Sequence, residues 1–228
     1  EEFLKRVMQY QAPLAAPKDL AWFLASYARE ARARLDKSEL DALGGIRAAL
    51  EEALGLRFDG KGGHHFFQST LIQTLFYGVF SAWVIWDQSA AGMKRSAHFD
   101  WRLAAQYLKV PILRKLFHEV AEPGLLEELR LPEVLDWAGA TLNRVDRASF
   151  FRSFEQCKAV QYFYEPFLEA FDPELRKELG VWYTPTEIVQ YMVGRVDQVL
   201  REELGRADGL ADPDVYVLDP CCGTGAFL

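Results

Sequence analysis

The chain has 228 residues, of which 50% are hydrophobic, and it carries a formal net charge of -7 with a pI near 5.2. This length and apolar content allow a buried core in one large or two small domains and exclude a disordered chain. The acidic balance excludes a surface that is basic throughout, so contact with nucleic acid requires a local patch. The cysteines lack the even spacing of a disulfide framework, which favours a reducing, cytoplasmic environment: they are Cys157, Cys221 and Cys222.

The sequence opens without the pattern of an export signal, and we expect no membrane contact. Its most apolar stretch, LIQTLFYGVFSAWVIW at 71–86, is shorter than the roughly 20 residues that span a bilayer. The stretch also contains Gln73, Thr74 and Ser81. It therefore predicts a buried helix rather than a membrane span.

Apolar residues recur at helical spacing over most of residues 1–179. Pro17 is a favourable first residue for a helix. A second predicted helix follows a pattern like a capping box at Ser38 and Asp41 and ends near Gly55. The first helix is expected to bury the face formed by Leu20, Phe23, Leu24 and Tyr27.

The glycine-rich stretch RFDGKGGHH, from Arg57 to His65, predicts a loop before a helix over 68–86. A polar break follows at 87–98, and prolines interrupt the next segment. A longer helix is predicted from about 146 to 171. We interpret its aromatic face as core, formed by Phe150, Phe154, Tyr162 and Phe163.

Near Gly180 the pattern changes from helical to α/β. A helix is predicted from 186 to about 204, a loop rich in Gly, Asp and Pro follows, and VYVL at 215–218 predicts a short strand. The fold class expected is mostly α, with a helical region over 1–179 and the beginning of an α/β, Rossmann-like domain over 180–228.

A glycine loop follows the predicted strand in LDPCCGTGAF, at 218–227. Glycine allows the backbone to approach a ligand closely, and the helix amino end after such a loop offers free N–H groups. The spacing lacks the third glycine of a dinucleotide fingerprint and the lysine of a P-loop. Neither a nicotinamide site nor a nucleoside triphosphate site fits.

A helix start lies about 35 residues earlier, in the sequence YTPTE. Thr184 suits the N-cap position, Pro185 the first helical position and Glu187 the third, which together make a capping box. A helix amino end attracts anions, including carboxylates.

The two stretches resemble motifs I and X of S-adenosylmethionine-dependent DNA methyltransferases. The D-P-x-x-G-[ST]-G form is that of enzymes modifying adenine N6, and motif X before motif I is the order of their gamma class. FYEPFL, FDPELR and GVWYTP, between 163 and 185, resemble the approach to the methylase domain in Type ISP and Type IIG restriction-modification enzymes and in phage-defence methylases. The resemblance is strong over 162–228 and weak over 1–161.

This resemblance implies S-adenosyl-L-methionine as cofactor and methyl transfer to adenine N6 in a specific DNA sequence, with the adenine flipped out of the duplex. It implies contact with double-stranded DNA and with helicase or nuclease domains or subunits of a restriction or defence system. The cofactor-binding residues that it implies are Tyr183, Thr184, Pro185, Asp219, Pro220, Cys221, Gly223, Thr224 and Gly225.

The resemblance assigns no catalytic residue to this chain. The family grips adenine with Asn/Asp-Pro-Pro-Tyr/Phe, a motif that the 228 residues do not contain. We therefore expect that the sequence is cut just after motif I of a longer methyltransferase, that the catalytic motif lies beyond Leu228, and that the chain alone is inactive.

Other candidate sites receive structural interpretations. Asp59-Gly60-Lys61 resembles the end of a nuclease motif, but no acidic strand residue precedes it, so a glycine turn is preferred. Adjacent His64 and His65 point apart, which argues against a metal site. The cysteine pair is expected to pack. We interpret the following basic residues as a solvated face rather than a phosphate-binding patch: Lys94, Arg95, Arg102, Lys109, Arg114 and Lys115.

Three functions stay open at this point. The first is an adenine-specific DNA methyltransferase of a restriction or defence system. The second is a methyltransferase of the same fold that acts on RNA, protein or a small molecule. The third is a helical interaction domain, such as a coupler between a motor and a methylase.

Overall fold

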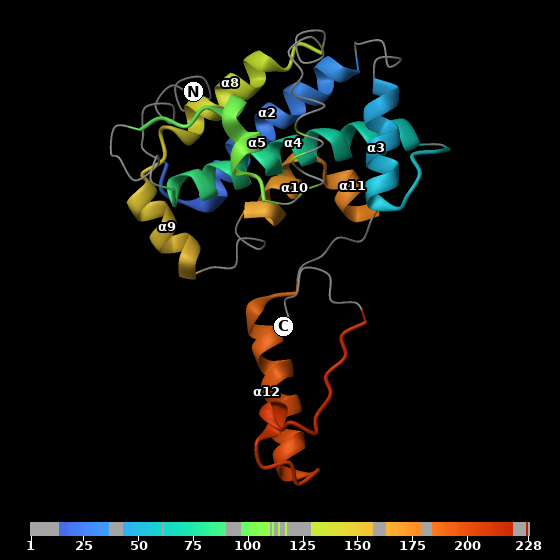
Figure 1. Cartoon of the computed structure of the whole chain (residues 1–228), viewed down its shortest axis with the longest axis vertical. Coiled ribbons are helices and arrows are strands. Elements are labelled where there is room, and N and C mark those ends of the chain that lie inside the picture. The colour runs from blue at the N-terminus through green and yellow to red at the C-terminus, as the bar shows by residue number, and fades with distance from the viewer. Residues whose placement is uncertain are drawn as a thin grey trace. The chain divides into compact units, whose positions relative to one another are not determined.

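The computed structural model describes residues 14–36, 43–60, 62–89, 97–109, 111, 114, 117, 129–156, 163–178, 184–220 and 227. The chain divides into two compact units, Glu1–Gly180 and Val181–Leu228 (Figure 1). Every regular element in these described ranges is a helix, and one isolated parallel bridge joins Leu14 to Val145. The prediction of a mostly helical chain is confirmed.

Unit 1 contains the helices α2 (Pro17–Leu35), α3 (Gly44–Leu54), α4 (Gly63–Asp87), η2 (Trp101–Leu103), α5 (Ala104–Tyr107), α8 (Pro132–Leu142), α9 (Arg147–Gln156), α10 (Glu165–Phe171) and α11 (Pro173–Glu178). Unit 2 contains α12 (Thr186–Glu202) and the short η4 (Gly209–Ala211).

The first two helices have the ends that their sequence predicts. Pro17 occupies the start of α2, where its missing N–H costs nothing. Helix α3 ends at Gly55, whose φ of 65° lies in the left-handed region that glycine adopts without strain. The capping-box pattern at Ser38 and Asp41 lies outside the described residues.

Helix α4 begins earlier than predicted, at Gly63 rather than near residue 68, so the loop expected to reach His65 is shorter. Gly62 turns the chain with a φ of 94° and allows the helix to start at once. A Cβ on Gly63 would lie 2.2 Å from the carbonyl oxygen of Phe58. Two glycines that the sequence analysis assigned to a loop therefore build the start of a helix.

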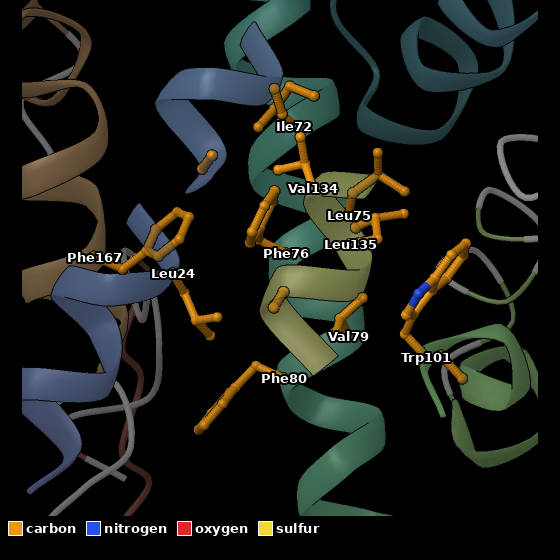
Figure 2. Close-up of a cluster of buried hydrophobic side chains, with 14 of the residues drawn as sticks. Leu24, Ile72, Leu75, Phe76, Val79, Phe80, Trp101, Val134, Leu135 and Phe167 are labelled. Atoms are coloured by element: carbon orange, nitrogen blue, oxygen red, sulfur yellow. The ribbon is translucent and has the colours of Figure 1, made fainter. Parts of the chain in front are cut away.

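Helix α4 is the central core element of unit 1. Figure 2 shows its side chains in one hydrophobic cluster with those of α2, α8, α10 and η2. The apolar spacing of α2 provides one wall and α8 another, as helical amphipathicity predicts. The labelled side chains are Ile72, Leu75, Phe76, Val79 and Phe80 of α4, Leu24 of α2, Trp101 of η2, Val134 and Leu135 of α8, and Phe167 of α10.

With 25 residues, α4 is long and apolar enough to cross a bilayer by length and composition. The length argument against a membrane span was therefore wrong, because the helix extends beyond residues 71–86 at its amino end. Most of its apolar stretch is nevertheless buried inside unit 1, as in a core helix. The prediction of a buried helix is therefore confirmed by the burial of its side chains and not by the length of its apolar stretch.

The segment predicted as one helix from about 146 to 171 contains α9 and α10, and residues 157–162 between them lie outside the described ranges. Phe150 and Phe163 are fully buried, as expected for core. Phe150 packs edge-on against Trp83 at 5.2 Å between ring centroids. Phe154 is half-buried, and Tyr162 is not among the described residues.

In unit 2, α12 is followed by a turn that includes η4, and residues 215–219 then leave the turn in an extended conformation (Figure 1). The predicted helix thus ends at Glu202, two residues earlier than expected.

Candidate functional site

The amino end of α12 differs by one residue from its prediction. Pro185, not Thr184, occupies the N-cap position, with φ of -54° and ψ of 142°, and no side-chain hydrogen bond caps this end. The carbonyl of Pro185 accepts the first helical hydrogen bonds, from the N–H groups of Ile188 at 3.0 Å and Val189 at 3.1 Å. The extended ψ of the proline keeps Thr184 outside the helix, so Thr184 is not the N-cap residue that the predicted capping box requires.

The first turn of α12 carries an acidic side chain. Glu187 falls at the second helical position and is exposed. Pro185, at the N-cap position, has no side-chain hydrogen bond to this end of the helix. Helix amino ends attract carboxylates and phosphates through their first N–H groups.

Some of the predicted cofactor residues can be placed. Thr184 is half-buried and Pro185 exposed before α12, and Asp219 is half-buried and Pro220 exposed at the end of the extended segment. The remaining ones, Tyr183, Cys221, Gly223, Thr224 and Gly225, lie outside the described residues.

The extended segment 215–219 does not pair as the strand that its sequence predicts, since the described ranges offer it no partner strand. Tyr216 and Leu218 are 94% and 85% exposed, and Val217, which points to the other face of an extended chain, is 65% exposed. Apolar residues on both faces are typical of a strand that is covered on both sides in a parallel sheet.

One face of α12 is also apolar and exposed. Ile188, Met192 and Val196 recur every four residues and are 48–51% exposed, with Tyr191 beside them. Val189, in contrast, is buried. Sequence periodicity predicts this stripe but not its exposure.

The turn after α12 is held by two charged side chains. Arg201 Nε donates to Asp197 Oδ2 at 2.7 Å, and the other oxygen of Asp197 accepts the N–H of Leu210 at 2.8 Å. Arg201 also donates to the carbonyls of Ala207 and Asp208, the second at 3.0 Å. We call this arrangement of Asp197 and Arg201 the clasp.

The Arg201 guanidinium, followed by the Leu210 N–H, holds the pKa of the Asp197 carboxyl below its ordinary value of 3.8. Asp197 in turn raises the pKa of Arg201. Both groups therefore remain charged throughout the physiological range.

Every basic residue of unit 2 pairs with a carboxylate of the same unit. Arg195 lies 3.1 Å from Glu203, and Arg206 lies 3.3 Å from Asp214 and 3.8 Å from Asp212. Together with Arg201 these are the only basic residues between Val181 and Leu228, where acidic residues outnumber them. Unit 2 thus presents an acidic surface whose cations are already neutralised.

Comparison with protein families tests the resemblance. Residues 157–228 match the family model described as N-6 DNA methylase. The match covers about a third of the chain, including α10, α11 and all of unit 2. It supports a relation to adenine DNA methyltransferases for this part of the chain. Neither a curated protein nor a solved structure matches.

A second polar cluster lies in unit 1, close to the start of the methylase match, and sequence reasoning missed it. Asp172, 2% exposed, accepts hydrogen bonds at Oδ2 from Arg32 at 2.7 Å and from Ser69 at 2.5 Å, and His65 Nε2 lies 2.9 Å from the same oxygen. Because Ser69 donates to the carboxylate and not to His65, this is no nucleophile with its base. The cluster joins α2, α4 and the junction between α10 and α11.

The remaining sequence candidates are structural or untested. Asp59 pairs with Arg47 at 3.2 Å, and Arg102 binds Asp136 at 2.8 Å. Lys61, Lys94, Arg95 and Lys115 are outside the described residues. Among the residues that can be described, no group of three or more His, Cys, Asp or Glu side chains is placed to hold a metal.

Proposed function

We propose that this chain is the front part of an S-adenosylmethionine-dependent DNA methyltransferase of the gamma class, acting on adenine N6 in a restriction or defence system of the Type ISP or Type IIG kind. The observation that carries the proposal is the methylase match over 157–228, which includes both the helix start at Tyr183–Pro185 and the glycine loop after Asp219.

The residues present suit the cofactor chemically. The amino end of α12 fits the carboxylate of its methionine part, because helix amino ends attract anions. Asp219 offers a carboxylate to the ammonium group at the same end of the molecule. Gly223 and Gly225 fit a loop whose backbone approaches the ligand closely. When bound, S-adenosylmethionine would supply the methyl group.

The catalytic step needs residues that the 228-residue sequence lacks. Adenine-specific methylases flip the base out of the duplex and hold its amine with Asn/Asp-Pro-Pro-Tyr/Phe. We therefore propose that the chain alone contributes cofactor-binding residues but does not methylate DNA. Detection of N6-methyladenine in plasmid DNA incubated with the purified chain and cofactor would overturn this part of the proposal.

Partners and location are proposed on the resemblance. Because the cations of unit 2 are paired internally, contacts with DNA phosphates are expected outside this unit. Helicase or nuclease domains of a cytoplasmic defence system are the proposed protein partners.

A second candidate function concerns unit 1 alone. It has its own core from Leu14 to Phe171, and the methylase match reaches only its last helices. This favours a helical coupler that links the methylase to a motor or nuclease. Activity of a partner helicase that is stimulated equally by residues 1–180 and by the whole chain would support the coupler.

Cofactor binding can be tested by saturation-transfer difference NMR, which detects millimolar affinity. We expect S-adenosylmethionine to give a signal that S-adenosylhomocysteine competes away and ATP does not. The Asp219→Asn variant should lose at least about threefold in affinity, as expected when a charge-assisted hydrogen bond is weakened. The matched control, Asp214→Asn, alters an exposed carboxylate of the same unit and should bind as wild type. Equal signals from ATP and the cofactor would contradict the proposal.

A further inference from the structure

The clasp fixes the turn from which the extended segment leaves. Asp197 and Arg201 lie one helical turn apart on α12. Arg201 binds the carbonyls of Ala207 and Asp208, and Asp197 binds the N–H of Leu210. These contacts join the side of the helix to the loop through charge-assisted hydrogen bonds, the stronger kind. The loop cannot move along α12 without breaking several of them together.

Gly209 shows how closely the turn approaches the clasp. A Cβ at this position would lie 1.9 Å from Asp197 Oδ1 and 2.8 Å from Arg201 Nε. Its φ of +60° also lies in the left-handed region. A side chain at this position would therefore displace the Asp197 carboxylate and the Arg201 guanidinium, and the positive φ also favours glycine.

The segment beyond the turn has a hydrogen-bonded start and exposed side chains in its middle. Its start is fixed by the N–H of Val215, which donates to the carbonyl of Asp212 at 3.0 Å. Tyr216, Val217 and Leu218 are exposed, so packing along the segment does not set its direction. Figure 1 shows the segment returning from the carboxyl end of α12 toward the level of its amino end.

We propose that the clasp is a positioning device for the cofactor site: Asp197 and Arg201 set where Asp219 lies relative to the amino end of α12. The inference rests on the proposed function, because Asp219 and that helix end are the two sides of the proposed cofactor site. Asp197 and Arg201 act through the backbone of the turn and are positioning residues, not cofactor ligands.

The test compares two glycine variants of the whole chain. Gly209→Ala places a methyl group against the clasp, whereas Gly205→Ala, at a similar φ of +64°, meets nothing within 4 Å. Both variants carry the backbone strain of a positive φ, but only Gly209→Ala disturbs the clasp. Hydrogen exchange of residues 207–219 and cofactor binding by NMR are measured for each, with circular dichroism as a check on helix content.

We expect exchange at Leu210 to accelerate about tenfold or more in Gly209→Ala relative to Gly205→Ala, since a hydrogen bond to a charged acceptor is lost. Cofactor affinity should fall at least about threefold in the same comparison. Equal exchange in the two variants would show that backbone strain, not the clasp, fixes the turn, and would overturn the inference.

If Gly209→Ala does not fold, a second pair of variants, Arg201→Lys and Arg195→Lys, tests the same inference. Arg201→Lys retains the charge but loses the fork that reaches both carbonyls and Asp197, and Arg195→Lys changes an exposed pair on the same helix. Arg201→Lys should accelerate hydrogen exchange at Leu210 and weaken cofactor binding, whereas Arg195→Lys should change neither. Asp197→Asn should behave like Arg201→Lys. Unchanged binding in Arg201→Lys alongside normal wild-type binding would refute the positioning role.

The two proposals fail differently. In one outcome, neither wild type nor any variant binds S-adenosylmethionine, but hydrogen exchange at Leu210 accelerates in the clasp variants. The proposed function then fails, and only the role of the clasp in holding the turn is supported. If wild type binds and Gly209→Ala binds equally well, the proposed function stands and the inference fails.

Discussion

At the scale of the residue, Asp172 is a buried charge that links distant parts of unit 1. Replacing it by Asn preserves its volume but removes the counter-charge of Arg32, whose side chain is 23% exposed. We expect the free energy of unfolding to fall by about 2–3 kcal/mol, because a buried ion pair loses one partner. Urea denaturation followed by circular dichroism measures the change.

The control for Asp172→Asn uses another arginine of α2. Glu30, 48% exposed, pairs with Arg34, and Glu30→Gln should cost less than about 1 kcal/mol, as surface pairs do. Equal losses in the two variants would show that burial of Asp172 contributes nothing.

Asp197 gives a prediction about pH. Its pKa is lowered in the folded chain by Arg201 and by the Leu210 N–H, so ionised Asp197 stabilises the clasp above its unfolded pKa, and this contribution is lost as pH falls through the folded pKa. The amide proton shift of Leu210, followed by NMR, should titrate with a midpoint below 3.8. The titration should be missing in Asp197→Asn, and a midpoint above 4 would contradict the clasp.

At the scale of the element, the start of α4 depends on Gly63. Gly63→Ala introduces a methyl group against the carbonyl of Phe58, and overpacking of this kind costs about 1–3 kcal/mol. Gly45→Ala in α3 meets nothing within 4 Å and should stabilise by up to about 1 kcal/mol through helix propensity. Opposite shifts in the thermal midpoint are therefore expected, and shifts of the same sign would contradict the described helix start.

Helix ends were predictable where a single local residue decides them. Pro17 and Gly55 are of this kind, because the ring of proline and the positive φ of glycine act without distant contacts. The start of α12 was missed because the sequence shows a good cap in Thr184 but not the extended ψ of Pro185 that excludes it. For α4, the short contact between Gly63 and Phe58 is a matter of packing and has no signal in the glycine pattern.

At the scale of the whole molecule, the cluster of buried hydrophobic side chains in the described residues extends from Leu14 to Phe171, within unit 1. We expect residues 1–180 to fold alone, with a thermal midpoint within about 3 °C of that of the whole chain, since no residue of this cluster is removed. Differential scanning calorimetry of both chains checks this. A loss of cooperative unfolding in residues 1–180 would show that unit 2 contributes to the core.

The two stretches proposed to bind the cofactor were recognisable from sequence because short spacings mark them; both lie within the methylase match, and their role in binding stays a prediction. The cluster around Asp172 was not recognisable from sequence, since its partners Arg32 and Ser69 are separated from it by more than 100 residues. Pairings of that kind depend on how helices assemble, which periodicity does not specify.

The pairing of α2 with α10 also has a consequence in time. Leu24 and Phe167 meet in the core, and Arg32 binds Asp172, so the fold of unit 1 closes only when its last helices exist (Figure 2). At a synthesis rate of about 5–20 residues per second, on the order of 4–17 s pass between the synthesis of the apolar α4 and the synthesis of α10. Over that interval the nascent chain exposes its most hydrophobic helix, and we expect its yield in cells to depend on chaperones that bind such segments.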